Sequence, residues 1–331
     1  MLPKPRQCRF QSLGPHGFHQ VAYTEWGNPR SDHIVVCVHG LTRNSRDFDA
    51  LATSLADRYR IVCMDVVGRG SSDWLRHKGD YGFPLYLSDA AALLARITAP
   101  LPSTRLRRAL YGPPRARRRV DWIGTSMGGL IGLFLAAKPR SPIRRLVLND
   151  VGPMVPWSAL THFKGIYTGH GKRFEDLDEI EKHLRIACAA FGPLPHDQWR
   201  QVAEHSALRK KDGGYVLAYD PGIMSNLRTG STTGIQFGSD FFSGVDLWPM
   251  WDAVRCPTLV LRGGESDLLL SSTAEEMATR GPKARIVQFP GIGHAPWLRS
   301  ANQIDVVRKF LLAKTARAAR QLQINPYTEA A

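Results

Sequence analysis

The sequence lacks the features that mark membrane and secreted proteins. No stretch approaches about 18 consecutive apolar residues, and no apolar run follows the basic N-terminus, so we expect neither a membrane span nor a secretory signal. The five cysteines form no C-x-x-C pair. Cys37, Cys63 and Cys256 lie in or beside apolar runs, which is typical of buried free thiols. These features predict a protein of the reducing cytoplasm.

The sequence also shows no glycine-rich phosphate loop and no His/Cys cluster with metal-ligand spacing, so we expect no cofactor and no metal. What is present is an ordinary globular composition, with 43% hydrophobic and 22% charged residues in a chain of 331. This length fits one large α/β domain, or a domain that carries a sizeable insertion.

Positive charge is concentrated in one segment, 103–119, which contains no acidic residue and which we call the Arg-rich segment. Its arginines are Arg105, Arg107, Arg108, Arg115, Arg117, Arg118 and Arg119. They contribute about half of the net charge of +15. A run of this kind, with Tyr111 as its only aromatic residue, is typical of a solvated loop, so nucleic-acid binding is not expected. The oligomeric state, monomer or dimer, stays open.

Short apolar runs alternate with helical patterns, which predicts a mostly parallel sheet covered by helices. The expected buried strands are 33–40, 60–68, 120–125, 143–152, 257–264 and 284–291, and an alternating stretch, 18–27, is expected at the edge. The expected helices are 47–57, 88–98, 127–138 and 302–322.

One interval, 153–244, contains no convincing core strand. It carries helical patterns at 174–191 and 196–210 and is too long for a structureless loop. We therefore expect an inserted helical lid here. The core would then consist of 1–152 and 245–331, with 103–119 as a loop insertion inside it.

The motif Gly124-Thr125-Ser126-Met127-Gly128 follows an expected strand and opens an expected helix. A tight turn of this kind holds the serine in a strained conformation and exposes its Oγ, and the flanking glycines avoid collisions with neighbouring chain. Ser126 is therefore the candidate nucleophile.

A serine hydroxyl needs a base, and His294 has the right position, on the loop after the last expected strand. His39, which ends the strand in "VCVHGL", is interpreted as structural, with its ring bonded near the loop that follows.

The base in turn needs a carboxylate. Asp267 lies on the loop after the preceding strand and is favoured by the chain order Ser, Asp, His. Asp150, also at the end of a strand, is the alternative acid, and Glu265 is a weaker third candidate.

An oxyanion would be stabilised by backbone N–H groups. Met127, directly after the nucleophile, and Leu41, on the loop after the first central strand, are the expected donors. Thr42 and Asn44 are candidates for supporting this loop.

Five stretches, "VVCVHGLTRNSRDF", "DVVGRGSSD", "WIGTSMGGL", "LVLRGGESD" and "GIGHAPWL", in this order resemble the α/β-hydrolase superfamily. The resemblance implies an eight-stranded, mostly parallel sheet, a Ser126–Asp267–His294 triad, oxyanion donors at Leu41 and Met127, and a lid over an apolar acyl pocket. The Arg-rich segment departs from the family pattern.

The resemblance implies a lidded serine hydrolase, most simply a carboxylesterase that acts on a small to medium apolar ester. A C–C bond hydrolase of ring-cleavage products, a lactonase and a perhydrolase are alternatives on the same triad, and a non-catalytic binding module is the alternative from another class. Expected pocket residues are Phe48, Trp157 and Trp297, and further apolar bulk comes from Met154, Val155, Phe163, Ile166, Tyr167 and Met224.

Overall fold

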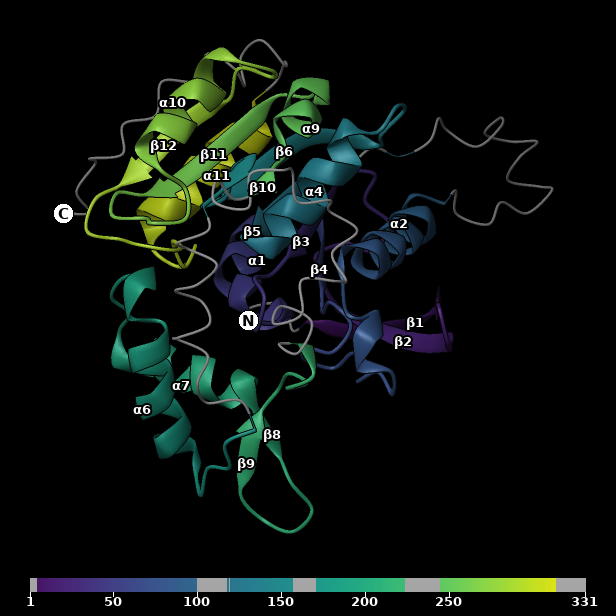
Figure 1. Cartoon of the computed structure of the whole chain (residues 1–331), viewed down its shortest axis with the longest axis vertical. Coiled ribbons are helices and arrows are strands. Elements are labelled where there is room, and N and C mark those ends of the chain that lie inside the picture. The colour runs from purple at the N-terminus through teal and green to yellow at the C-terminus, as the bar shows by residue number, and fades with distance from the viewer. Residues whose placement is uncertain (1–4, 100–117, 119, 157–170, 224–244, 314–331) are drawn as a thin grey trace.

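The protein is built on an eight-stranded, mostly parallel sheet with helices on both faces, which confirms the expected α/β fold (Figure 1). The computed structural model describes residues 5–99, 118, 120–156, 171–223 and 245–313. The strands run in the order β1-β2-β4-β3-β5-β6-β11-β12. They are β1 (Arg6–Gly14), β2 (Gly17–Trp26), β3 (Ile34–Val38), β4 (Arg60–Met64), β5 (Val120–Thr125), β6 (Ile143–Asn149), β11 (Thr258–Gly263) and β12 (Arg285–Phe289).

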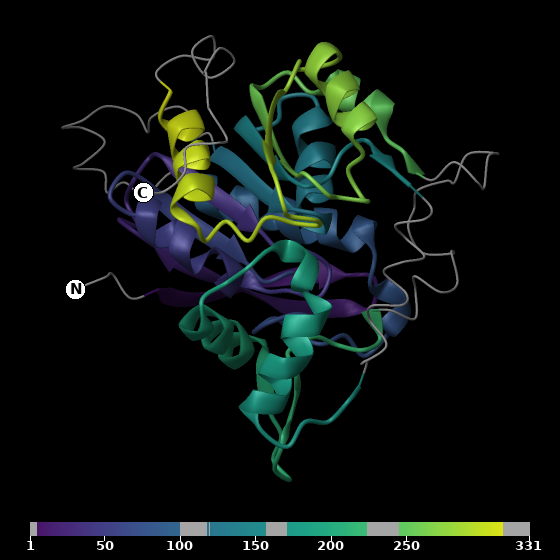
Figure 2. The ribbon, with the colours of Figure 1, turned by 90° about the vertical axis from the view of Figure 1, so that its left-hand side faces the viewer.

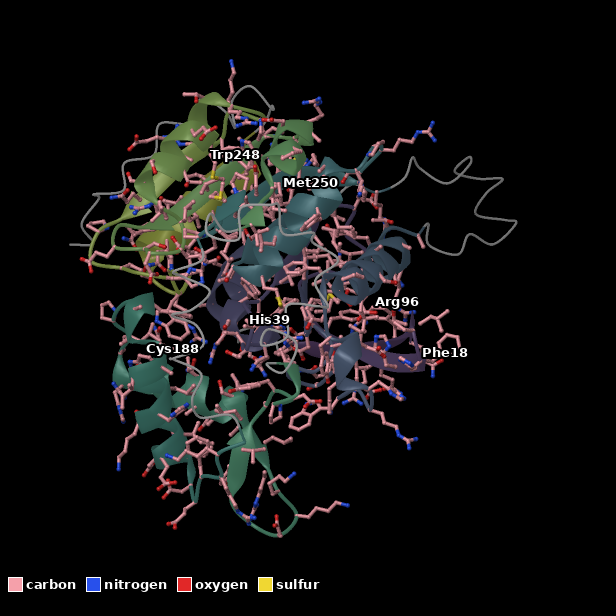
Figure 3. All side chains as sticks on the ribbon, in the orientation of Figure 1. Phe18, His39, Arg96, Cys188, Trp248 and Met250 are labelled. Atoms are coloured by element: carbon pink, nitrogen blue, oxygen red, sulfur yellow. The ribbon has the colours of Figure 1, made fainter. Side chains whose placement is uncertain are left out.

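The parallel strands β3, β4, β5, β6, β11 and β12 correspond to the six expected apolar runs. The expectation that β2 is the edge strand is wrong, because β1 pairs with it antiparallel along its whole length. The β1–β2 hairpin extends from the body, and Phe18 near its tip is 72% exposed (Figure 3).

Helices pack against both faces of the sheet, and an apolar cluster lies between the sheet and the helices on each face. On one face pack α2 (Phe83–Thr98), α4 (Met127–Ala137), α9 (Trp248–Ala253) and α10 (Ser271–Thr279). On the other pack α1 (Asp49–Leu55) and α11 (Ala301–Leu312). Helix α2 begins five residues before the expected start, since Pro84 in its first turn is compatible with a helix there. The expected helix 302–322 extends beyond α11 into residues that are not described.

Residues 171–223 form a separate layer below the sheet, drawn in teal in Figures 1 and 2. It contains α6 (Leu177–Ala187), α7 (His196–Ser206) and a hairpin of β8 (Ala207–Arg209) and β9 (Tyr215–Leu217), which the sequence pattern did not predict. We call it the α6–α7 unit. Its own apolar cluster includes Phe174, Ile180, Leu184, Trp199 and Val202. These residues lie inside the interval expected to form a lid.

Two short strands, β7 (Met154–Val155) and β10 (Val245–Asp246), pair with each other where the chain leaves the core and returns to it. The domain boundaries stay a prediction, and so does the role of the Arg-rich segment, most of which lies outside the described residues. In the described part of the chain, no helix is long and apolar enough to cross a bilayer.

Candidate active site

Ser126 occupies a sharp turn between β5 and α4, with φ 52° and ψ −118°. This conformation is strained for a residue with a Cβ atom. The neighbouring glycines explain how the turn is accommodated: a Cβ on Gly124 would lie 2.2 Å from the Gly128 carbonyl oxygen, and one on Gly128 would lie 2.0 Å from that of Val38. The expected glycine clearance is therefore present, and the N-terminus of α4 points its positive dipole end at the serine.

His294 is buried, 8% exposed, and its Nδ1 lies 2.7 Å from Oδ2 of Asp150. The carboxylate bonded to Nδ1 of His294 is that of the alternative acid, Asp150, and not that of the favoured Asp267, whose assignment as the acid stays a prediction. A carboxylate on Nδ1 fixes the tautomer of a neutral imidazole, with the Nδ1 proton donated to the acid.

The Asp150 carboxylate is fully buried and receives two further hydrogen bonds. The amide of Gly263 donates to Oδ1 at 2.8 Å, and the Ser266 hydroxyl donates to Oδ2 at 2.5 Å. Asp150 has a positive φ of 57°, a conformation that aspartate tolerates better than most residues. The three donors satisfy this buried carboxylate and fix its position against the imidazole of His294.

The loop after β11 contributes a serine where sequence position favoured an acid. Asp267 and Glu265 are both exposed, whereas Ser266 between them is buried. The Ser266 oxygen also accepts from the amides of Leu268 and Leu269, at 3.3 and 3.1 Å, which fixes its position against Asp150.

Asn149, the last residue of β6, links the turn that carries Ser126 to the loop that carries His294. The sequence pattern did not predict this role. Its fully buried Nδ2 donates to Thr125 Oγ1 at 3.1 Å and to the Pro296 carbonyl at 2.8 Å. Its own carbonyl accepts from the amide of Ser126 at 3.0 Å. The only sequence signal was its place directly before Asp150, which identifies no side-chain partner. Asn149 thus ties the serine turn to the histidine loop.

The loop after β3 lies beside the nucleophile, since a Cβ on Gly40 would be 3.7 Å from Cβ of Ser126. His39 stabilises this loop: its Nδ1 donates to the Gly40 carbonyl at 2.6 Å, and its Nε2 accepts from the Val66 amide at 3.0 Å. Burial lowers the pKa of His39 to about 3, so the ring is neutral, in agreement with a structural role. In Figure 3 His39 lies near the centre of the molecule.

The two expected oxyanion donors lie on the elements that flank Ser126. Met127 begins α4, and Leu41 follows Gly40 on the loop after β3. Asn44 and Thr42 lie further along this loop, and Asn44 Nδ2 donates to the His205 carbonyl of α7 at 2.9 Å. Their roles at an oxyanion stay predictions.

The expected pocket residues have different environments. Phe48 is 1% exposed in the core beside α1, so we leave it out of the pocket. Trp297 packs against the α6–α7 unit, with ring centroids 4.9 Å from Phe191 and 5.6 Å from Trp199. Trp157, Phe163, Ile166, Tyr167 and Met224 lie outside the described residues.

A cavity of about 30 Å³ lies between the loop after β3 and the α6–α7 unit. Its lining includes Thr42, Arg43, Asn44, Leu184, Cys188 and Phe191. Phe191 also meets the His294 ring edge-on, with centroids 6.2 Å apart, so the cavity adjoins the histidine. Within the described residues, no group of three or more His, Cys, Asp or Glu side chains is arranged to hold a metal ion.

Comparisons with known proteins agree with the fold. Residues 35–306 match the model of the "Alpha/beta hydrolase family". The chain is 39% identical to a 3-hydroxybutyrate-oligomer hydrolase of Cupriavidus necator, covering 94% of this chain and 99% of that one. It is 25% identical to a 2-(acetamidomethylene)succinate hydrolase of Mesorhizobium japonicum, covering 80% and 82%. A solved α/β hydrolase of Novosphingobium aromaticivorans superposes with a TM-score of 0.77 at 32% identity, covering 94% and 99%.

Proposed function

Because this chain belongs to the α/β-hydrolase family, we propose that it is a serine hydrolase that cleaves carboxylic esters through an acyl-enzyme on Ser126. The observation that carries the proposal is the buried His294–Asp150 pair, on a loop that Asn149 ties to the strained turn of Ser126. Asp150 takes the role of the acid in place of Asp267.

In the acylation step, Oγ of Ser126 attacks the ester carbonyl carbon and its proton passes to Nε2 of His294. The imidazolium is stabilised by the Asp150 carboxylate on Nδ1. The carbonyl oxygen becomes an oxyanion that accepts hydrogen bonds from the amides of Leu41 and Met127. Collapse of the tetrahedral intermediate breaks the C–O bond, and the alcohol leaves with the proton from His294.

In the deacylation step, His294 removes a proton from water, whose oxygen attacks the acyl carbon. A second oxyanion forms at the same donors. Its collapse returns the proton from His294 to Ser126 Oγ and releases the carboxylic acid. No cofactor takes part in this sequence of steps.

For the substrate we propose a short ester oligomer of a small hydroxy acid. The relative at 39% identity is named for 3-hydroxybutyrate oligomers, and it matches this chain over nearly the full length of both. Each ester bond of such an oligomer joins two small acyl units, which agrees with the small to medium substrate expected from the sequence.

The test is a substrate panel with the purified protein: p-nitrophenyl acetate, p-nitrophenyl butyrate, and linear 3-hydroxybutyrate dimer and trimer. We expect a burst of p-nitrophenol equal to the enzyme concentration when deacylation is slow, and the loss of all turnover in Ser126→Ala. Release of 3-hydroxybutyrate monomer, followed by chromatography, tests the substrate class.

Three results would contradict the proposal. Turnover of p-nitrophenyl esters without cleavage of either oligomer overturns the substrate class but not the serine hydrolase. Turnover that persists in Ser126→Ala, or no ester cleavage at all, overturns the mechanism and favours the alternatives. The panel also includes one assay for each alternative activity: a ring-cleavage dienoic acid for a C–C hydrolase, a lactone for a lactonase and peracid formation for a perhydrolase. A protein that turns over none of these substrates would be a non-catalytic binding module.

A further inference from the structure

Arg69, on the loop after β4, is a fully buried arginine without a carboxylate partner in the described part of the chain. Two buried acids on neighbouring segments are engaged elsewhere. Asp65 accepts from the amides of Ser45 and Ser71, and Asp220 accepts from Lys78 and from the Tyr81 hydroxyl. Burying an uncompensated charge is costly, and an apolar side chain of similar volume is usually more favourable. Burial without a carboxylate does not by itself assign a role, because Arg262 on β11 shares it, so the contacts of Arg69 have to decide.

The polar contacts of Arg69 place its guanidinium against both residues whose amides are the expected oxyanion donors. Nε donates to the Leu41 carbonyl at 2.8 Å, and Nη2 lies 3.8 Å from the thioether sulfur of Met127. Nη1 donates to the Val67 carbonyl at 2.7 Å and to the Tyr86 hydroxyl at 2.9 Å, and the guanidinium lies over the Tyr86 ring at 4.8 Å.

A comparison with Arg262 on β11 shows that these contacts differ from those of a scaffold arginine. Arg262 is also buried, but its N–H groups bond to the carbonyls of Leu269 and Gly264 and to the Gln288 side-chain oxygen. All of these acceptors are oxygen atoms. Nη2 of Arg69 instead meets a sulfur, which is a weak acceptor. Among the described residues, Nη2 of Arg69 thus has no oxygen acceptor, and no carboxylate balances the charge of the guanidinium.

We propose that Arg69 is an electrostatic positioning residue of the oxyanion hole: it holds the Leu41 carbonyl, and its unpaired charge stabilises the negative charge that develops between Leu41 and Met127. This inference rests on the proposed function. The amide nitrogen and carbonyl oxygen of one residue are about 3 Å apart, so the guanidinium lies about 7 Å from the oxyanion. At an effective dielectric constant of about 20, a charge at this distance changes a rate about tenfold to a hundredfold.

The test separates charge from hydrogen bonding with two variants, Arg69→Lys and Arg69→Gln. Lysine keeps the charge, whereas glutamine can still donate to the Leu41 carbonyl but is neutral. With p-nitrophenyl butyrate we expect Arg69→Gln to lower kcat about tenfold to a hundredfold and to leave KM within about threefold. Arg69→Lys should retain most of kcat.

Phenylboronic acid provides a readout that a scaffold role would not move, because it forms a tetrahedral anion on Ser126 that resembles the transition state. Its inhibition constant should rise in Arg69→Gln by the same factor as kcat falls, and change little in Arg69→Lys. Arg145→Gln is the matched control. Arg145 is 4% exposed on β6, near the end of the strand away from Asn149, so its loss should lower the melting temperature and leave kcat unchanged.

Each other outcome overturns the inference. Equal losses in both variants assign the effect to hydrogen bonding alone, and a rise in KM without a fall in kcat makes Arg69 a substrate-binding residue. Unchanged kcat and boronate affinity in Arg69→Gln exclude any role at the oxyanion. If Arg69→Gln and Arg69→Met both fail to fold, the role is structural. A wild type that cleaves no ester overturns the proposed function and this inference together, whereas an active wild type with unaffected variants overturns only the inference.

Discussion

The loops after β6 and β11 offer the same residue type at the same edge of the sheet, yet the carboxylate bonded to Nδ1 of His294 belongs to the loop after β6. Asp150 follows β6 and Asp267 follows β11, and the two strands are parallel neighbours with Leu261 paired to Asn149. Asp150 is fully buried and bonded to His294, whereas Asp267 is exposed.

The difference lies in the direction that each backbone gives to its side chain. The Asp150 amide bonds to the Leu261 carbonyl, and its positive φ accompanies a carboxylate that is bonded to the Gly263 amide. The loop after β11 places Ser266 at this point and leaves Asp267 at the surface. Two loops can therefore share one function, in which one supplies the charge and the other supplies a donor that holds it.

The strongest test of this difference is Asp150→Asn. Asparagine keeps the size of the side chain and can still accept one hydrogen bond, but it no longer stabilises an imidazolium at His294. We expect kcat to fall about 10⁴-fold, measured as initial rates on p-nitrophenyl butyrate.

The fold of Asp150→Asn has to be checked by thermal unfolding, because the residue is buried among three donors. A folded Asp150→Asn protein that retains more than a tenth of the wild-type kcat would contradict the assignment of the acid and return Asp267 to consideration.

The sequence pattern could not predict which of the two acids bonds to His294, and the reason is physical. Hydrophobic runs reveal parallel strands buried on both faces, so β3, β4, β5, β6, β11 and β12 could be located. Chain order then places Ser126, His294 and both acids at one edge of the sheet. Which acid points inward depends on backbone torsion and on the donors around it, and no periodic pattern encodes these.

The missed elements have similar causes. Strand β1 carries few apolar residues because it lies at the edge and buries only Phe10 and Ser12 deeply. Asn149 acts through its amide group on two distant segments, and this contact exists only once β5, β6 and the histidine loop are packed together. Pocket residues were the least predictable, since Phe48 packs into the core although its residue type suits either place.

Ser266→Ala tests the contribution of the β11 loop to the carboxylate. A hydrogen bond to a charged group contributes about 1.5–3 kcal/mol, so the variant should lose about this much free energy of unfolding. Because Asp150 would be held less firmly against His294, kcat should also fall about tenfold. Chemical denaturation and initial rates measure the two effects.

Ser271→Ala is the matched control, because its hydroxyl bonds to Glu275 on the exposed side of α10. This change should stay within about 0.5 kcal/mol of wild type and leave kcat unchanged. Equal effects of the two substitutions would mean that Ser266 does not hold Asp150.

Two buried histidines, His39 and His19, also differ in their hydrogen-bond partners. The difference is measurable as the pH dependence of the free energy of unfolding. Among the described residues His39 is bonded only to backbone groups, and burial lowers its pKa to about 3. His19 lies 3.0 Å from Asp89, and although burial alone would lower its pKa, the hydrogen bond and charge of Asp89 raise it. The contributions of these two histidines to stability therefore have opposite pH dependence.

Between pH 6.5 and 3 the unfolded chain protonates His39 while the folded protein does not, so stability falls as the pH falls. From pH 7.5 to 5.5 this residue should cost about 1.4 kcal/mol of unfolding free energy. His39→Gln should remove that part of the slope. The stabilisation from His19 is present below about pH 6.5 and is lost as the pH rises through its raised pKa, so His19→Gln should flatten the alkaline side. Identical profiles for wild type and His39→Gln in urea unfolding would contradict a neutral buried ring.

The smallest effect is expected from Asp267→Asn, the counterpart of the first substitution on the neighbouring loop. The Asp267 side chain is exposed, and exposed charges contribute at most about 1 kcal/mol to a neighbour, an effect that salt screens. We expect kcat on p-nitrophenyl butyrate to stay within about threefold of wild type, and any difference to vanish in high salt. A salt-independent loss of a hundredfold or more would show that Asp267 moves into the site when substrate binds. Both acids, Asp150 from the loop after β6 and Asp267 from the loop after β11, would then act on His294 in the substrate complex, although only Asp150 is buried in the free protein.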